Sequence, residues 1–243
     1  MKALALTRRR ASIAALRSVA LFGLVVPSRL WAGQAVQIPA GACLLTRRLV
    51  RGLRDNRSIT VTRSWRIEFS RQSRGIAISG EQVSVSVSAP ERLKAIAKIE
   101  EERSTQSLFP ILLAPDGTIT AAGQNTAEAS VDAAIELAQR LLAAAISEAS
   151  EPSQHAAYLS RLQEAGSAVL DEMPGDLFYP STEPFREVRR IVLPDGSSGS
   201  FEMRWQASAQ SGSGLLKTAR REVITRIGES ARQSSEEWSL EMI

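Results

Sequence analysis

The arginines near the N-terminal end of the chain are the residues whose types and spacing suggest the clearest chemistry. Residues 47 to 74 contain nine arginines and two acids, Asp55 and Glu68, a net charge of +7. Guanidinium groups bind phosphate and carboxylate groups through paired hydrogen bonds. We therefore expect four of these arginines to form a patch that binds an anionic surface, either an anionic lipid or an acidic protein partner. The four are Arg47, Arg48, Arg51 and Arg54.

A plainer interpretation of the same arginines competes with this one. The chain has 26 arginines and four lysines, so arginine is its usual cation. Arginines on strands commonly solvate an exposed face or pair with acids on neighbouring strands. A structural role is therefore the alternative for the whole patch.

Arg63 and Trp65 are the candidate ligand-binding residues. Arg63 interrupts the apolar face of a predicted strand between Val61 and Trp65, where a charge needs a partner or a polar cavity. Its guanidinium would bind a polar group of the ligand, and the indole of Trp65 would cover an acyl chain. The alternative gives both residues structural roles, Arg63 paired with a buried acid and Trp65 in the core.

The scarcity of histidine and cysteine excludes several classes of site. His155 and Cys43 are the only residues of their types, so the usual cysteine and histidine zinc sites cannot be assembled. The sequence has no phosphate-binding loop, dinucleotide-binding glycine pattern or nucleophile elbow. We predict no catalytic residue, no metal and no cofactor. We expect His155 to pack within a helical hairpin and Cys43 to be buried.

Residues 1–35 are predicted to be a signal peptide that is cleaved. Three arginines at residues 8–10 precede an apolar run over residues 19–26, and small residues follow. This order is typical of export signals, and the apolar run is too short to span a bilayer. We expect cleavage near Ala32 or Ala35, with the general secretory route favoured over the twin-arginine route. The mature chain would then be periplasmic or secreted, without a transmembrane segment.

Removal of such a signal changes the charge of the protein. The whole chain has 30 basic and 26 acidic residues, and six of the basic ones lie within residues 1–32. The mature chain therefore has 24 basic residues against 26 acids, a net charge of −2. The excess of basic residues belongs to the signal and is no argument for nucleic-acid binding, so we predict no nucleic-acid partner.

The first part of the mature chain alternates apolar and polar residues, as half-buried strands do. Residues 59–69 follow this alternation closely, and residues 43–53 are expected to pair with them across Asp55-Asn56. Residues 76–87 are predicted to form a second hairpin with Ser79-Gly80-Glu81 as its turn.

The middle of the chain is helical and the last third returns to strands. Residues 126–173 are predicted to form a helical hairpin, because apolar residues recur at spacings of four and three around a break at Pro152. A short helix is expected after Pro90. Further strands are predicted over residues 109–113, 118–120, 186–193, 200–209 and 215–227, followed by a final strand that contains Trp238.

These elements predict an α+β fold in a single domain over residues 36–243. About ten antiparallel strands would form a large curved sheet, which is either open or closed far enough to be a half-open barrel. The helical hairpin, inserted between two strand-rich halves, would pack on this sheet.

We expect a non-enzymatic protein of the cell envelope that binds an apolar or anionic amphiphile between the sheet and the helices. The expected architecture resembles that of periplasmic lipoprotein and lipid carriers. One alternative is an envelope protein–protein interaction module without a small ligand. A lesser alternative is a carboxylate-based hydrolase, which would need two converging acids with shifted pKa values. The sequence does not indicate the oligomeric state.

Overall fold

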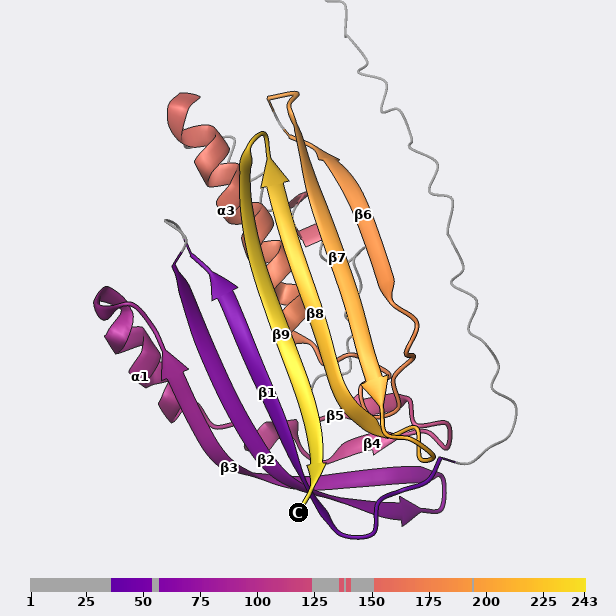
Figure 1. Ribbon diagram of the computed structural model, residues 1–243. Helices are drawn as coiled ribbons and strands as arrows, with labels where there is room; N and C mark the ends of the chain where they lie inside the picture. Colours follow the sequence, from indigo (N-terminus) through magenta and orange to yellow (C-terminus); the bar gives the residue numbers. More distant parts are fainter. Residues whose placement is uncertain (1–35, 54–56, 124–135, 138, 141–150, 194) are drawn as a thin grey trace, which may run out of the picture. The chain divides into compact units, whose positions relative to one another are not determined.

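The computed structural model describes residues 36–53, 57–123, 136–137, 139–140, 151–193 and 195–243. For residues 151–156 and 166–167 it describes the backbone alone. Nine strands make up most of the described structure. The strands are β1 Ala42–Gly52, β2 Ser58–Gln72, β3 Gly75–Ser88, β4 Ile111–Leu113, β5 Ile119–Ala122, β6 Phe185–Val192, β7 Ser198–Ala209, β8 Leu216–Ile227 and β9 Ser230–Met242. They form one antiparallel sheet in the order β5-β4-β3-β2-β1-β9-β8-β7-β6 (Figure 1). The sheet is not closed into a barrel: within the described residues, β5 and β6 are its edges.

The two halves of the chain meet in the middle of the sheet. β1 pairs with β2, as predicted, and on its other side with β9, so that Arg47 lies between Arg63 of β2 and Trp238 of β9. This second pairing joins residues near the two ends of the described chain. The alternation of strand side chains then places Arg47, Arg63 and Trp238 on the same face.

The predicted second hairpin is wrong. Residues 75–88 form the single continuous strand β3, which pairs along its length with β2 and contains an irregularity in register opposite Ser64 and Trp65. Gly80 is not a turn residue here. A Cβ at Gly80 would lie 2.6 Å from the ring of Phe109, so glycine allows close packing. Because two predicted strands are one, the sheet has nine strands rather than about ten.

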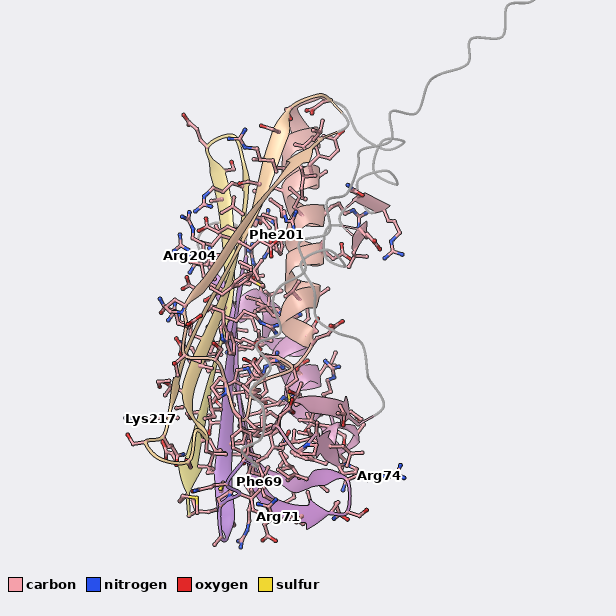
Figure 2. The ribbon with its side chains drawn as sticks, turned by 90° about the vertical axis from the view of Figure 1, so that its right-hand side faces the viewer. Phe69, Arg71, Arg74, Phe201, Arg204 and Lys217 are labelled. Atoms are coloured by element: carbon pink, nitrogen blue, oxygen red, sulfur yellow. The ribbon has the colours of Figure 1, made fainter. Side chains whose placement is uncertain are left out.

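In the part of the chain that the structure describes, α1 and α3 pack on one face of this sheet, which we call the inner face (Figure 2). Helix α1 Lys94–Glu102 follows a 3-10 turn after Pro90, as predicted, and contacts β3. Helix α3 Glu151–Asp171 contacts β8 and β9. It confirms the second arm of the predicted helical hairpin. The first arm, residues 126–150, lies almost entirely outside the described residues, as does the side chain of His155.

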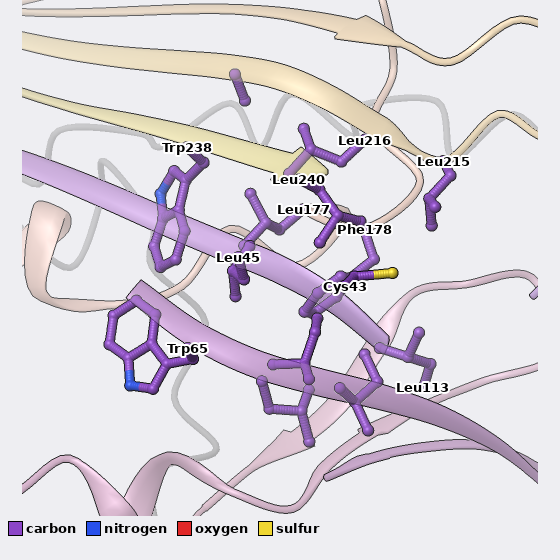
Figure 3. Packing of buried hydrophobic residues seen from close by; sticks show 14 of the residues in the cluster. Cys43, Leu45, Trp65, Leu113, Leu177, Phe178, Leu215, Leu216, Trp238 and Leu240 are labelled. Carbon is purple, nitrogen blue, oxygen red and sulfur yellow. The ribbon is translucent and has the colours of Figure 1, made fainter. Parts of the chain in front are cut away.

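The inner face carries two apolar clusters. One joins α3 to the sheet, with Leu162 of the helix against Phe201 and Ile227. The other gathers Leu45, Ile67 and Leu240 at the opposite end of the strands (Figure 3). Burial of the apolar surface in the first cluster is the main contribution that holds α3 on the sheet.

Cys43 belongs to the second cluster. It is fully buried, and its Sγ lies 3.4 Å from Sδ of Met242. The same burial raises the pKa of the thiol. The prediction that Cys43 is a buried packing residue is therefore confirmed.

The outer face of the sheet is polar and rich in arginine, and Figure 2 shows Arg204 extending from it, away from the helices. Glu202 is a buried acid on this face, with 2% of its surface exposed. Its carboxylate accepts hydrogen bonds of 2.7 Å from each of Arg186, Arg204 and Arg226. These bonds outweigh the cost of burial and lower the pKa of Glu202 to about 2.

Candidate functional site

A cavity of about 870 Å³ lies on the inner face between the sheet, α1 and the C-terminal end of α3. Strands β1, β2, β3, β5 and β9 contribute to its walls. Its apolar lining includes Leu49, Ile59, Val61, Val87, Ile119 and Met173. The volume lies within the range of small-molecule sites, roughly 300–1,000 Å³. Successive side chains of a strand lie on opposite faces of the sheet, and the strand residues among these lie on the face toward the helices.

Arg63 lies in the cavity wall and binds the C-terminal end of α1. Its Nη2 donates hydrogen bonds of 2.5 Å to the carbonyl oxygen of Glu100 and 3.1 Å to the carboxylate of the same residue. Its Nη1 donates to the carbonyl oxygen of Arg103 at 3.3 Å and to Gln82 at 2.9 Å. Arg63 is 6% exposed, so these bonds satisfy a buried cation.

Trp65 is the next cavity residue on β2, and its polar atom is already bonded. The indole Nε1 donates a 2.9 Å hydrogen bond to Oγ1 of Thr105, which in turn donates to Gln82 at 2.7 Å. The ring stacks on Trp238 of β9 with the ring centroids 6.3 Å apart and the planes 24° apart. Figure 3 shows these two indoles one above the other. The pair forms an aromatic wall of the cavity.

Arg47 joins this wall to a buried acid. Its guanidinium carbon lies 5.0 Å from the centroid of the Trp238 ring, a cation–π distance. Its Nη2 and Nε donate to Oε2 of Glu236 at 2.7 and 2.9 Å. The other oxygen of Glu236 forms an ion pair of 2.6 Å with Arg221, without hydrogen-bond geometry. Glu236 has no exposed surface, and burial lowers the pKa of Arg221.

The same arginines bind the C-terminal end of α3. Arg47 donates to the carbonyl oxygen of Leu170, Arg221 donates to that of Glu172 at 2.6 Å, and Arg51 pairs with the carboxylate of Asp171. The last carbonyls of a helix lack partners within the helix and carry a partial negative charge. The inner-face arginines therefore act as C-terminal caps, Arg63 for α1 and Arg47 with Arg221 for α3.

Five side-chain polar atoms are buried and have no hydrogen-bond partner among the described residues: Nε of Arg51, Oε2 of Glu172, Nε of Arg221, Oε1 of Glu236 and Nε1 of Trp238. Of these residues, Arg51, Glu172 and Trp238 line the cavity. Burial raises the pKa of Glu172, partly opposed by the positive charge of Arg221. An unpartnered buried polar atom costs free energy, so these atoms lower the stability of the ionic cluster at the end of α3.

The structure places the predicted site residues as follows. Arg63 and Trp65 both line the cavity. The arginine patch is divided between the faces of the sheet: Arg47 and Arg51 lie on the inner face, and Arg48 pairs with Glu237 on the outer face at 3.5 Å. Arg54 lies outside the described residues. Binding of the patch to an anionic surface stays a prediction, and each described member has an acidic partner within the chain.

The sequence did not point to Trp238, Glu236 or Glu172 as site residues. Trp238 was predicted only to lie in the final strand. Glu236 stands two residues before Trp238, just as Arg63 stands two residues before Trp65. The pattern that identified Arg63, a charge on the apolar face of a strand, therefore also occurs at Glu236. Their meeting with Arg47 depends on the pairing of β1 with β9, which spacing along the chain does not reveal.

Within the described ranges, no group of three or more histidine, cysteine, aspartate and glutamate side chains is arranged to hold a metal ion. None of the helices described there is long and apolar enough to cross a membrane. The chain matches none of the known protein-family models, and a comparison with curated proteins gives no significant match either.

Proposed function

We propose that this protein is an exported binding protein of the cell envelope, which holds an amphiphile in the inner-face cavity. The observation that carries the proposal is the cavity itself, about 870 Å³ between the sheet and two helices. Its walls combine an aromatic pair and aliphatic side chains with almost as many polar side chains, seven of them charged. Apolar walls with polar groups that fix orientation are typical of small-ligand sites, and the large polar share here favours an amphiphile over a purely apolar ligand.

The charged groups around the cavity support binding rather than catalysis. Arg63, Arg47 and Arg221 are engaged by helix carbonyls and acids. The buried acid Glu236 is held between two arginines. Groups fixed in this way hold the walls of the cavity in place, and their bonds to the helix ends and to one another occupy the atoms that catalysis would need.

Export is the second part of the proposal. The order of basic, apolar and small residues over 1–35 supports it. The hydrophobic effect opposes the passage of amphiphiles through water, so they need a carrier. An envelope location would place such a carrier beside the membranes that contain its ligands.

A fluorescent apolar probe tests whether the cavity binds amphiphiles. N-phenyl-1-naphthylamine, which brightens in apolar surroundings, should bind the chain isolated from expressing cells at micromolar concentration. Val87→Trp fills the cavity from β3 and should weaken probe binding at least tenfold. Ser86→Trp is the matched control, because the neighbouring residue is exposed on the other face of the same strand and should bind the probe normally.

Circular dichroism of both variants separates blocked binding from misfolding, since an overfilled cavity costs about 1–3 kcal/mol. Equal probe binding by the wild type and both folded variants would contradict the proposal. An absence of probe binding in the wild type would favour the alternative of a protein–protein interaction module.

A further inference from the structure

The charged side chains around the cavity include one more cation than acids. Those that line it are four arginines and three acids: Arg47, Arg51, Arg63 and Arg103, with Glu100, Asp171 and Glu172. Arg221 and Glu236, which pair behind this lining, add one charge of each sign. With all groups ionised, the cavity therefore has a net charge of +1.

The surplus charge lies at the end of α1. At the end of α3, three arginines are matched by three acids: Arg47, Arg51 and Arg221 with Asp171, Glu172 and Glu236. At the end of α1, two arginines share Glu100, whose carboxylate lies 3.1 Å from Nη2 of Arg63 and 3.7 Å from Nη1 of Arg103. α1 packs against β3 and α3 against β8 and β9, so the two clusters belong to different parts of the wall (Figure 1).

The two other acids at the end of α1 lie outside the cavity lining. Glu101 accepts a 3.4 Å hydrogen bond from the backbone amide of Val87, and Glu102 pairs with Lys98 at 3.9 Å. The carbonyl oxygens of Glu100 and Arg103, which carry the partial negative charge of the helix end, both accept from Arg63. These groups therefore leave Arg103 as the cation that faces the cavity without a matched acid.

Arg103 differs from the other arginines of the cavity because its guanidinium is open to solvent and to a ligand. The side chain is 71% exposed, and its contact with Glu100, at 3.7 Å, is longer than a hydrogen bond. Arg47 and Arg63, in contrast, already donate to carbonyl and carboxylate oxygens. The N–H groups of Arg103 are therefore available to a molecule bound in the cavity.

Two hydroxyl groups follow Arg103 along the same stretch of the wall. Ser104 and Ser107 are exposed and line the cavity. Oγ of Ser104 accepts a 3.3 Å hydrogen bond from the amide of Gln106, and its O–H can still donate. A guanidinium with neighbouring hydroxyl donors suits the oxygens of a carboxylate or a phosphate.

We propose that the cavity binds an amphiphile whose head group is a single anion, a carboxylate or a phosphate ester, paired with Arg103. This rests on the proposed function, since it specifies the ligand of the same cavity. One negative charge balances the surplus at the end of α1. The chain of the ligand lies on the aliphatic wall, where Leu49, Val61 and Val87 are in register on three neighbouring strands.

Displacement of N-phenyl-1-naphthylamine by amphiphiles of equal chain length tests the head-group preference. They are dodecanoate, dodecyl phosphate, 1-dodecanoylglycerol and dodecyltrimethylammonium, each used below its micelle concentration. At least one anion should displace the probe at a concentration about fivefold or more below that of the glycerol ester, and the ammonium should be the weakest, since one basic group contributes about a factor of five. The tighter anion identifies the head group as carboxylate or phosphate. Equal or tighter binding of the glycerol ester or the ammonium than of both anions would overturn the proposal.

Free anions distinguish an amphiphile from a small ion. Acetate and inorganic phosphate, at the concentrations used for the amphiphiles, should leave the probe bound because they lack a chain for the aliphatic wall. Displacement of the probe by either free anion would show that the site takes a small ion, and it would contradict the assignment of an amphiphile.

Substitutions on α1 and just after it test the role of Arg103. In Arg103→Gln the anion and the glycerol ester should displace the probe at concentrations within about twofold of each other, and Arg103→Lys should keep part of the preference. Lys98→Gln is the matched control: it removes the same charge from a residue outside the cavity lining and should keep the full preference. The ratio of the two displacing concentrations is compared within each variant, so differences in probe affinity cancel.

Equal loss of the preference in Lys98→Gln and Arg103→Gln would mean that net charge sets it, and an unchanged preference in Arg103→Gln would exclude this residue as the head-group partner. Either result overturns this inference and leaves the proposed function standing, provided that the probe binds the wild type. Absence of probe binding by the wild type overturns the proposed function itself.

Discussion

Arg47 and Glu236 lie on neighbouring strands in the middle of the sheet and meet through two hydrogen bonds, of 2.7 and 2.9 Å, to one carboxylate oxygen. Because Arg47 also binds the carbonyl of Leu170, this pair connects the two halves of the sheet to the end of α3. The same end of α3 forms part of the cavity wall. The stability of this ionic cluster and the shape of the cavity are therefore linked.

Replacement of Glu236 should be strongly destabilising. Glu236→Gln leaves Arg47 and the buried Arg221 without their shared counter-charge, and the loss of one partner from a buried ion pair costs about 3–5 kcal/mol. Urea denaturation measures the change in the free energy of unfolding. Glu237→Gln is the control: its side chain is 37% exposed and pairs with arginines on the outer face, so the expected cost is below about 1 kcal/mol. Similar effects of the two changes would contradict the account.

Loss of Arg63 should release α1. Arg63→Met keeps the length of the side chain and removes the hydrogen bonds to Glu100 and Arg103, with an expected cost of about 1.5–3 kcal/mol. Amide hydrogen exchange should accelerate over Lys94–Glu102 and stay unchanged in α3. Arg66→Met, on the exposed side of the same strand, should alter neither. Unchanged exchange in α1 of the Arg63 variant would show that the cap does not hold the helix.

Glu202 makes stability depend on pH in the acid range. Hydrogen bonds from Arg186, Arg226 and Arg204 lower its pKa from 4.5 to about 2, so the ionised form stabilises the fold at neutral pH. The pKa is lower in the folded than in the unfolded chain, hence this contribution is complete above about pH 4.5 and is lost as the pH falls toward about 2. We expect about 1–3 kcal/mol after screening by solvent around the partly exposed arginines.

The test compares urea midpoints of the wild type and Glu202→Gln as a function of pH. The difference between them should shrink as the pH falls from about 5 to about 3. A difference that stays constant over this range would mean that the carboxylate of Glu202 is not selectively stabilised in the folded state.

Processing of the N-terminus tests the proposal of export. The protein isolated from its own cells should begin near Gly33 or Val36, because the small residues Ala32 and Ala35 suit signal peptidase. N-terminal sequencing gives the answer directly. Recovery of the chain with Met1 intact from the envelope fraction would contradict cleavage.

The sequence predicted the strands and helices better than the contacts between them. Alternation identified β1 and β2 and their pairing, because each strand has one apolar face. It failed at Gly80. The tripeptide Ser79-Gly80-Glu81 has the composition of a turn, but Gly80 lies within a strand and allows the ring of Phe109 to pack closely against it. Local sequence carries no information about the ring that approaches a glycine from another segment.

The candidate site shows the same limit. Arg63 and Trp65 were predictable because a charge and an indole follow one another on the apolar face of a strand. The arginine patch was predicted as one surface although strand residues 47 and 48 must face opposite sides. The partners of Arg47, namely Glu236 and Trp238, come from the far end of the chain, and long-range strand pairing brings them together.

Native mass spectrometry of the protein isolated from its own cell envelope tests the central claim most directly. The wild type should carry one amphiphile of a few hundred daltons, a size that fits a cavity of about 870 Å³, and organic solvent should release it. The cavity-filling variant Val87→Trp, prepared in the same way, should have the mass of the bare chain, and Ser86→Trp should retain the ligand. A wild type without any bound molecule, or an adduct equally abundant in Val87→Trp, would contradict the claim that this cavity is a ligand-binding site.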